Sequence, residues 1–172
     1  MDNNKHQNMD SFAEKKAQEC LTFNFCSNLN LQSIKDKLAI MLKHIGDNGM
    51  FAEYTMHDIS HVDGMLNLLE KIIPNRTKDD MTPADWLMTV LAIYFHDLGM
   101  HIPQGEYDNR ESNSEFLQTK DKMLMNPEIQ SYVESLQDDQ GEKFLYQEYV
   151  RKNHGKRICE WITNCDKKDQ EP

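Results

Sequence analysis

Two short groups of residues in this sequence have the types and spacing that bind metal ions. His57 and His61 are four residues apart, which places both imidazoles on one face of a predicted helix. His96 and Asp97 are adjacent, and they stand where the most apolar predicted helix ends. An unpaired carboxylate is costly to bury there, whereas a cation would neutralise Asp97 and use the lone pair of His96. The two groups together favour a metal site.

Each histidine also has a simpler explanation when it is taken alone, because a single helical histidine is often only a polar side chain with a partner. Mixed nitrogen and oxygen ligands suit manganese, iron, zinc, nickel or cobalt better than calcium, so we expect one or two divalent ions of that group. The cysteines match no common zinc spacing, and we expect them to be reduced thiols. They are Cys20, Cys26, Cys159 and Cys165.

The elements that hold these residues are predicted to be helices, because apolar residues recur at helical spacing and no alternating run suits a sheet. The expected helices are 31–46, one from near Met50 or Tyr54 to before Pro74, 84 to about 97, 114–124, 127–136 and 142 to about 163. The helix that ends at His96 and Asp97 is apolar almost all round, so we expect it to be the central buried helix. The fold class is therefore all-α.

The chain divides into three parts. Residues 1–30 are polar and rich in asparagine, and we expect them to be partly disordered apart from the short segment 21–25. Residues 31–165 carry the helical pattern and form the predicted domain, and residues 166–172 form a polar tail. Residues 75–82 read as a loop, which closes on a helix start with Thr82 as N-cap and Pro83 behind it.

The composition excludes several classes of function. The 172 residues carry 29 acidic and 19 basic side chains, a formal net charge of -10, which argues against broad nucleic-acid binding. A small phosphorylated substrate is still compatible with this charge, because a metal ion supplies positive charge locally. No apolar run is long enough to cross a bilayer and no signal core is present, so we expect a cytoplasmic protein that does not enter a membrane.

Two segments resemble the HD-domain superfamily of metal-dependent phosphohydrolases: YTMHDISHVDGML at 54–66 and LAIYFHDLGM at 91–100. The resemblance covers about residues 31–165 and implies an HD-domain-like helical bundle. It also implies that His61, His96 and Asp97 are metal ligands. If the site is binuclear, Asp97 is expected to bridge the two ions. The superfamily's final ligand is an aspartate on a later helix, and the last aspartate suited to that role in this chain is Asp166, in the polar tail.

The segment YVRKNHGKRICEWI at 149–162 is similar to bacterial HD domains that precede ATPase or nucleotide-cyclase modules. This likeness implies that His154 binds a second metal, although His154 also reads as a surface histidine among basic residues. His57 resembles the first histidine in the HNxxH segment of cyclic-nucleotide phosphodiesterases, with Asp58 in place of the asparagine. The implied role of His57 is to protonate the leaving oxygen. Arg151, Lys152, Lys156 and Arg157 either contact a phosphate or form a solvated helix face.

These patterns support three hypotheses. In the first, the chain is a phosphohydrolase, by itself or as the N-terminal part of a larger protein, that cleaves a phosphoester of a nucleotide or signalling nucleotide with a metal-activated water. In the second, it is a non-catalytic sensory or regulatory module that binds a metal or nucleotide and regulates an attached ATPase or a partner. In the third, it is a structural bundle whose histidines are incidental. The aspartate expected after His154 separates the first hypothesis from the second.

Overall fold

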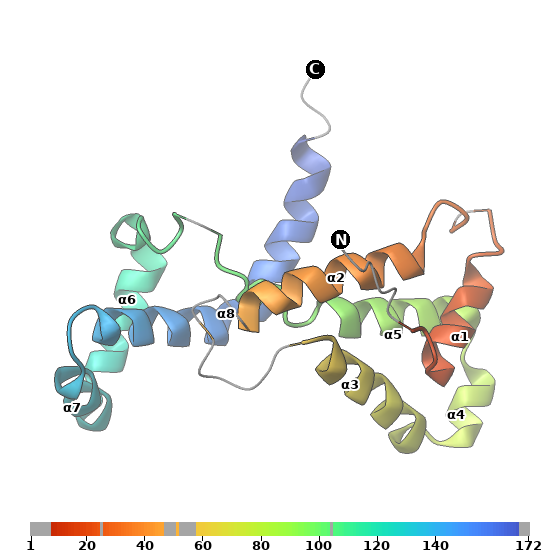
Figure 1. Cartoon of the computed structure of the whole chain (residues 1–172), viewed down its shortest axis with the longest axis horizontal. Helices are drawn as coiled ribbons and strands as arrows, with labels where there is room; N and C mark the ends of the chain where they lie inside the picture. Colours follow the sequence, from red (N-terminus) through yellow and green to blue (C-terminus); the bar gives the residue numbers. More distant parts are fainter. Residues whose placement is uncertain (1–7, 25, 47–50, 52–57, 104, 169–172) are drawn as a thin grey trace, which may run out of the picture.

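A computed structural model describes residues 8–24, 26–46, 51, 58–103 and 105–168 of the chain. Its described part contains eight α-helices, two 3₁₀ turns and no strand, which confirms the all-α prediction (Figure 1). The elements are α1 (Phe12–Cys20), α2 (Leu31–Gly46), α3 (Ile59–Ile72), α4 (Asn75–Asp80), α5 (Pro83–Phe95), η1 (Leu98–Met100), η2 (Arg110–Ser112), α6 (Ser114–Leu124), α7 (Pro127–Ser135) and α8 (Gln140–Lys168).

The helix starts follow from local capping. At α5, the Thr82 side chain accepts a hydrogen bond from the backbone of Asp85, whose carboxylate accepts in return from the Thr82 backbone. At α7, the Asn126 side chain accepts from the backbone N–H of Glu128, and Pro127 is at the first helical position. At α3, the Asp58 carboxylate accepts from the backbone N–H groups of Ser60 and His61. Asp58 therefore fixes the start of α3 at Ile59, later than the predicted start near Met50 or Tyr54.

The N-terminal segment differs from the expectation of partial disorder, because residues 12–20 form helix α1. A capping box between Ser11 and Glu14 starts this helix. Its buried residues are Ala13, Glu14, Ala17 and Cys20, and the three small side chains among them allow close packing against α5. A short helix, α4, also replaces the loop that was expected at residues 75–80. Neither helix has the large apolar stripe on which the sequence reading relied.

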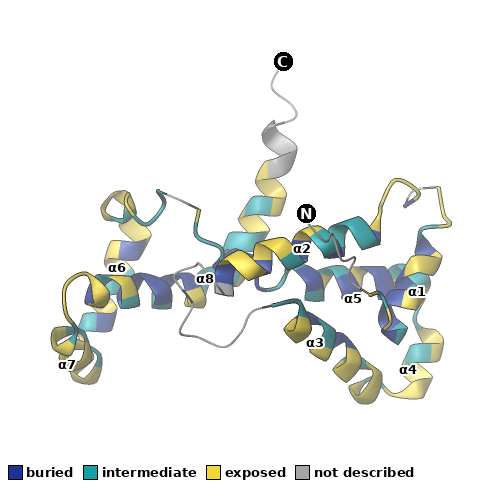
Figure 2. Cartoon of the chain, in the orientation of Figure 1, coloured by how far each residue is buried: buried dark blue, intermediate teal, exposed yellow. Residues whose placement is uncertain are grey.

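Helix α5 lies at the centre of one half of the molecule, where it contacts α1, α2 and α3 (Figure 1). Trp86, Val90 and Tyr94 form its buried face, whereas Met88 on the opposite side is exposed. Figure 2 shows the buried residues concentrated on α1, α5 and the first part of α8, with α3, α4 and α7 largely exposed. The helix expected to be the central buried one is thus central to this half, but it is buried along one face only.

The other half of the molecule consists of α6, α7 and the first part of α8, which pack against one another. Helix α8 also packs against η1, which directly follows the His96–Asp97 pair. Figure 1 shows that α8 changes direction along its length, so that its last part leaves the two halves. None of the described helices is long and apolar enough to cross a membrane.

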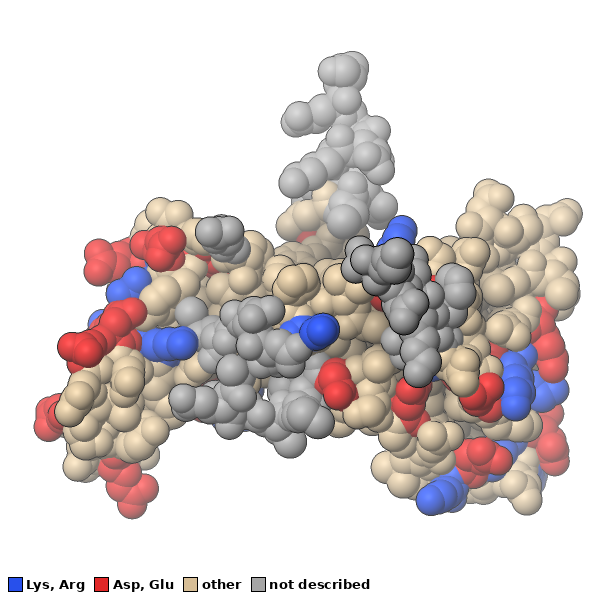
Figure 3. Space-filling model, viewed as in Figure 1, with Lys and Arg blue, Asp and Glu red and all other residues tan. Residues whose placement is uncertain are grey.

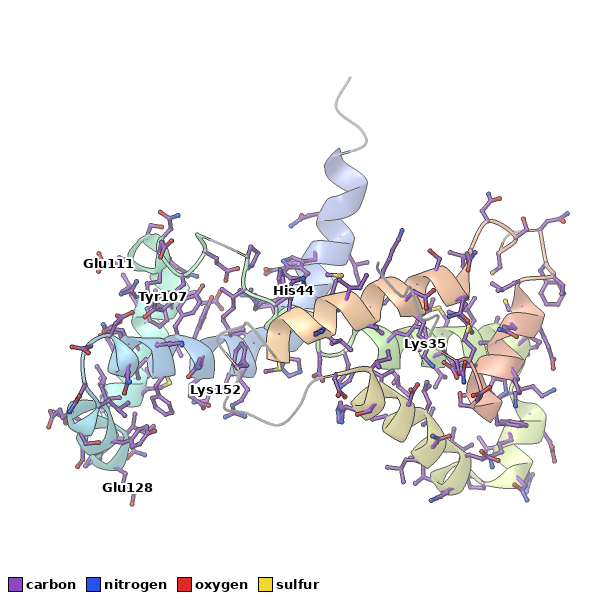
Figure 4. All side chains as sticks on the ribbon, viewed as in Figure 1. Lys35, His44, Tyr107, Glu111, Glu128 and Lys152 are labelled. Carbon is purple, nitrogen blue, oxygen red and sulfur yellow. The ribbon has the colours of Figure 1, made fainter. Side chains whose placement is uncertain are left out.

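A buried ionic network connects α1 to three other helices. The Lys35 ammonium of α2 lies 2.8 Å from the Glu14 carboxylate and 2.7 Å from that of Asp63 on α3. The Tyr94 hydroxyl of α5 donates to Glu14 over 2.6 Å. Lys35 and Glu14 are each only 1% exposed, so each charge needs its partner. Figure 4 shows Lys35 on the side of α2 near these helices.

Charged side chains on the face drawn in Figure 3 gather at its two ends, over α6 and α7 and over α3 and α4. Acidic and basic groups are mixed there, and the described part of this face carries no broad basic patch. This distribution agrees with the net charge of -10.

Candidate metal centre

Three of the predicted ligands meet where α3 begins and α5 ends. His61 lies in the first turn of α3, three residues after the Asp58 cap. His96 is the C-cap of α5, and Asp97 is the next residue, at the start of η1. The turn is held by two backbone hydrogen bonds, from Met100 N–H to the Asp97 carbonyl (2.9 Å) and from His101 N–H to that of Leu98 (3.0 Å). Two separate helix ends thus carry the site.

The ligand atoms of His61, His96 and Asp97 all lie within 4.8 Å of one another, so the three side chains form a group that can hold a metal ion. The Nε2 atom of His96 is 2.9 Å from Oδ2 of Asp97, and that of His61 is 3.8 Å from the same oxygen. Exposure falls from 45% at the His61 side chain through 26% at His96 to 8% at Asp97. The buried carboxylate is therefore at the base of the site, and His61 is at its solvent side.

The two nitrogens of His96 have different partners. Nδ1 lies 2.6 Å from the Ile93 carbonyl, which can only accept, so Nδ1 carries the proton and Nε2 faces Asp97. The hydrogen bond with Asp97 raises the pKa of His96, and the Ile93 carbonyl adds to this effect, although burial opposes it. A positive charge between Nε2 and Oδ2 is therefore favourable, whether a proton or a metal ion supplies it.

The two distances from the Asp97 carboxylate to the histidine nitrogens fit metal coordination by nitrogen and oxygen. Such bonds are roughly 2.1 Å long, so two ligands at a right angle are about 3.0 Å apart and two opposite ligands about 4.2 Å apart. The separations of 2.9 and 3.8 Å fall at or close to this range. Metal-bound histidines commonly donate their second N–H to a backbone carbonyl, as His96 does to Ile93.

The remaining predicted site residues either lie outside the described residues or are not among the three grouped ligands. His57, predicted to be catalytic, lies outside the described residues, as does the side chain of Asp166. The Nδ1 atom of His154 on α8 is 2.6 Å from the Arg151 carbonyl, and His154 is not among the three grouped ligands. Its backbone nevertheless lies against Gly99, two residues after Asp97. The metal role of His154 stays a prediction.

The basic cluster on α8 is mostly engaged with carboxylates. The pairs are Arg151 with Glu148 (2.7 Å), Lys156 with Glu115 (2.8 Å) and Arg157 with Glu106 (2.7 Å). Lys152 is exposed, on the first part of α8 (Figure 4). The first two pairs suit the solvated helix face that was one of the two readings. Arg157 fits neither reading, since it is mostly buried against the turn that carries Asp97.

The sequence did not lead us to predict two features around the site, the Ile93 carbonyl and the pair of Glu106 and Arg157. The Ile93 carbonyl is one turn before His96, so helical spacing alone could have found it. Glu106 and its partner Arg157 are 51 residues apart, and no local pattern in the sequence connects them.

A comparison with protein-family models gives a match to the family named HD-CE over residues 51–171. This stretch is more than half of the chain and contains all three grouped ligands. No curated protein and no solved structure matches the chain. The match agrees with the predicted HD-like helical domain and says nothing about neighbouring modules. On its sequence and its helical fold, the chain belongs to the HD-CE family.

Proposed function

We propose that this domain is a metal-dependent phosphohydrolase that hydrolyses a phosphoester of a nucleotide or signalling nucleotide. The observation that carries the proposal is the convergence of one ligand atom each from His61, His96 and Asp97 within 4.8 Å. The HD-CE family match over the same residues supports it. The proposed metal is one or two divalent ions of manganese, iron, zinc, nickel or cobalt, because the ligands are imidazole and carboxylate.

A divalent ion in this site would lower the pKa of water and polarise a phosphoryl oxygen. The residues of the chain have distinct tasks around it. Asp97 supplies negative charge at the buried base, and the Ile93 carbonyl keeps His96 in the tautomer whose Nε2 can bind. Three protein ligands leave positions for water and substrate, as catalytic metal sites require. The exposure of His61 makes its side the proposed entrance for the phosphate.

Charge supports a small substrate. The chain carries a net charge of -10 and its exposed surface would repel a polyanion, whereas the metal site attracts a single phosphate group locally. His57, which precedes His61 by four residues, is the proposed proton donor to the leaving oxygen. An ATPase or nucleotide-cyclase module, in a longer chain or as a partner, is part of the same proposal, on the likeness of residues 149–162.

The second candidate is a non-catalytic module that binds a metal or nucleotide and regulates a partner. One observation favours it: across the part of the chain that the structure describes, the metal group contains three side chains and no later aspartate. Tight binding without turnover is the behaviour that this candidate requires.

Turnover of a panel of nucleotides and cyclic nucleotides with Mn²⁺ tests the proposal, with Asp97→Asn compared against Asp121→Asn. Asp121 is an exposed aspartate on α6, distant in sequence from the site, so its variant controls for the change in charge. We expect Asp97→Asn to reduce turnover by more than about a hundred-fold, because residues that only orient metal ligands already contribute roughly 10- to 100-fold. Equal activity in the two variants rules out this active site. Binding without turnover in the wild-type protein supports the regulatory candidate.

A further inference from the structure

A mostly buried arginine connects α8 to the turn that carries Asp97. Nε of Arg157 donates to the Gly99 carbonyl over 2.7 Å, and Nη2 donates to the His101 carbonyl over 2.9 Å. The same guanidinium donates twice to the Glu106 carboxylate, from Nη1 to Oε1 over 2.7 Å and from Nη2 to Oε2 over 3.1 Å. Four of its five N–H donors are therefore used, and its side chain is only 13% exposed.

Glu106 is itself held in place from a second position on α8. The Tyr146 hydroxyl donates to Oε1 of Glu106 over 2.7 Å, and this is the oxygen that also receives Nη1 of Arg157. Tyr146 is fully buried, and its ring contacts those of Tyr107 and Phe116. The carboxylate thus fixes the orientation of the guanidinium, whose planar fork then faces the two carbonyls of the turn.

The backbone of α8 touches the same turn one helical turn earlier. A Cβ atom on Gly99 would lie 1.9 Å from the His154 carbonyl oxygen and 2.7 Å from the carbonyl carbon, so the two backbones are in direct contact there. His154 and Arg157 are three residues apart, hence on one face of α8. This face of α8 therefore holds the turn in place by backbone contact at Gly99 and by hydrogen bonds to the Gly99 and His101 carbonyls.

Backbone hydrogen bonds within the turn connect these contacts to Asp97. Met100 N–H donates to the Asp97 carbonyl and His101 N–H donates to the Leu98 carbonyl, so the backbone at positions 97–101 forms one tight unit. Fixing the carbonyls of Gly99 and His101 also fixes the peptide groups that set the direction of the Asp97 side chain. A metal site tolerates little error, because its ligand distances vary by only about 0.2 Å.

We infer that Arg157, oriented by Glu106, is a positioning residue that sets the place of Asp97 relative to His61 and His96. This inference rests on the proposed metal site and deepens it, because it assigns part of the site's geometry to α8. A lysine could not do the same, since one ammonium cannot reach two carbonyls and a carboxylate in a fixed plane.

The test compares Arg157→Gln, Arg157→Lys and Glu106→Gln with the control Lys156→Gln. Lys156 is the neighbouring basic residue on α8, and it pairs with Glu115 on the exposed surface. Three measurements are made on each folded protein: Mn²⁺ affinity by calorimetry, the visible absorption spectrum with Co²⁺ as a probe of ligand geometry, and amide hydrogen exchange at Met100 and His101.

We expect Arg157→Gln to weaken Mn²⁺ binding by roughly 10- to 100-fold, the range for residues that orient metal ligands. It should also change the Co²⁺ spectrum and speed exchange at the two amides by about ten-fold or more, since the turn opens locally. Glu106→Gln should move all three readouts in the same direction by less, and Lys156→Gln should move none. If Arg157→Gln does not fold, Arg157→Lys decides by the same readouts.

A folded Arg157→Gln protein with wild-type Mn²⁺ affinity and Co²⁺ spectrum overturns the inference, even if its amides exchange faster, because Arg157 is then only structural. A wild-type protein that binds metal but hydrolyses no phosphoester refutes the proposed function and leaves this inference standing. A wild-type protein that takes up no metal overturns the site and the inference together.

Discussion

Asp97 is the residue on which the chemistry of the site depends. Its carboxylate is 8% exposed and faces Nε2 of His96 at 2.9 Å. In the absence of a metal, a proton on Nε2 satisfies this carboxylate, which is why the pKa of His96 is raised. A metal and a proton thus compete for the same nitrogen.

This competition predicts the pH dependence of metal binding. The hydrogen bond to Asp97 raises the pKa of His96 above its ordinary value of 6.5, so the metal must displace a proton near and above that pH. Affinity should rise with pH by up to about ten-fold per unit until the raised pKa is passed, and then level off. Calorimetry in buffers of different ionisation enthalpy counts the protons released.

The stability of the metal-free protein should change with pH in the opposite direction to metal affinity. Because the folded pKa of His96 is raised, its protonation stabilises the metal-free protein fully below the unfolded pKa. That contribution is lost as pH rises through the folded value. Metal affinity that fell with rising pH across this window would contradict the role given to His96. A His44→Ala variant, in which an exposed histidine of α2 is removed, is the control for the pH dependence of metal affinity.

The three ligands could be found from the sequence because their signals are local. His61 lies in a helix start marked by Asp58, and His96–Asp97 ends an apolar run. The pairing of Glu106 with Arg157 could not be found, since it depends on how α8 crosses the turn. The ligands could therefore be predicted from the sequence, whereas the residues that hold them in position could not.

At the scale of elements, helices with their own caps and apolar stripes were predictable. The expected ranges 31–46 and 114–124 coincide with α2 and α6. Helix α1 was missed although the Ser11–Glu14 capping box marks its start, because it lacks a large apolar stripe. Its buried Glu14 is acceptable only when Lys35 and Tyr94 approach, and they are 21 and 80 residues away. Such distant partners leave no periodic signal around Glu14 itself.

Two glycine substitutions should have opposite effects on the stability of the protein, because Gly99 lies against α8 and Gly64 has free space around it. Gly99→Ala would place a Cβ atom 1.9 Å from the His154 carbonyl oxygen, backbone that cannot turn aside, and should destabilise the fold by about 1–3 kcal/mol or more. Gly64→Ala in α3 meets nothing within 4 Å and should stabilise the protein by up to about 1 kcal/mol through helix propensity.

Urea unfolding of the two variants beside the wild type measures both effects. A Gly99→Ala protein as stable as the wild type would show that η1 and α8 are not in direct backbone contact. A Gly64→Ala protein that is less stable would show that α3 packs more tightly at this position than the structure has it.

At the scale of the whole molecule, the family match and the core do not share one boundary. The match begins at residue 51, whereas α1 and α2 precede it and still pack against α3 and α5. The Lys35 network is the clearest link, because it joins α1, α2, α3 and α5 around the buried pair of Lys35 and Glu14. The N-terminal helices thus complete the core around the matched domain.

This link predicts a large cost for Lys35→Met. The substitution leaves the buried Glu14 carboxylate without its counter-ion, and it should destabilise the protein by about 3–5 kcal/mol. Lys16→Met removes an exposed pair with Glu19 on the same helix α1 and should cost less than about 1 kcal/mol. The difference in urea midpoint tests the network, and equal effects would show that α1 is not held by buried charge.

The hydrogen bond between Tyr94 and Glu14 spans 80 residues, and this separation has a consequence during synthesis. Ribosomes add about 5–20 residues per second, so α1 emerges roughly 4–16 s before the tyrosine that it must meet. A nine-residue helix is not stable alone in water, and Glu14 stays hydrated during that interval. The first helix of the chain is therefore set in place only after α5 has been made.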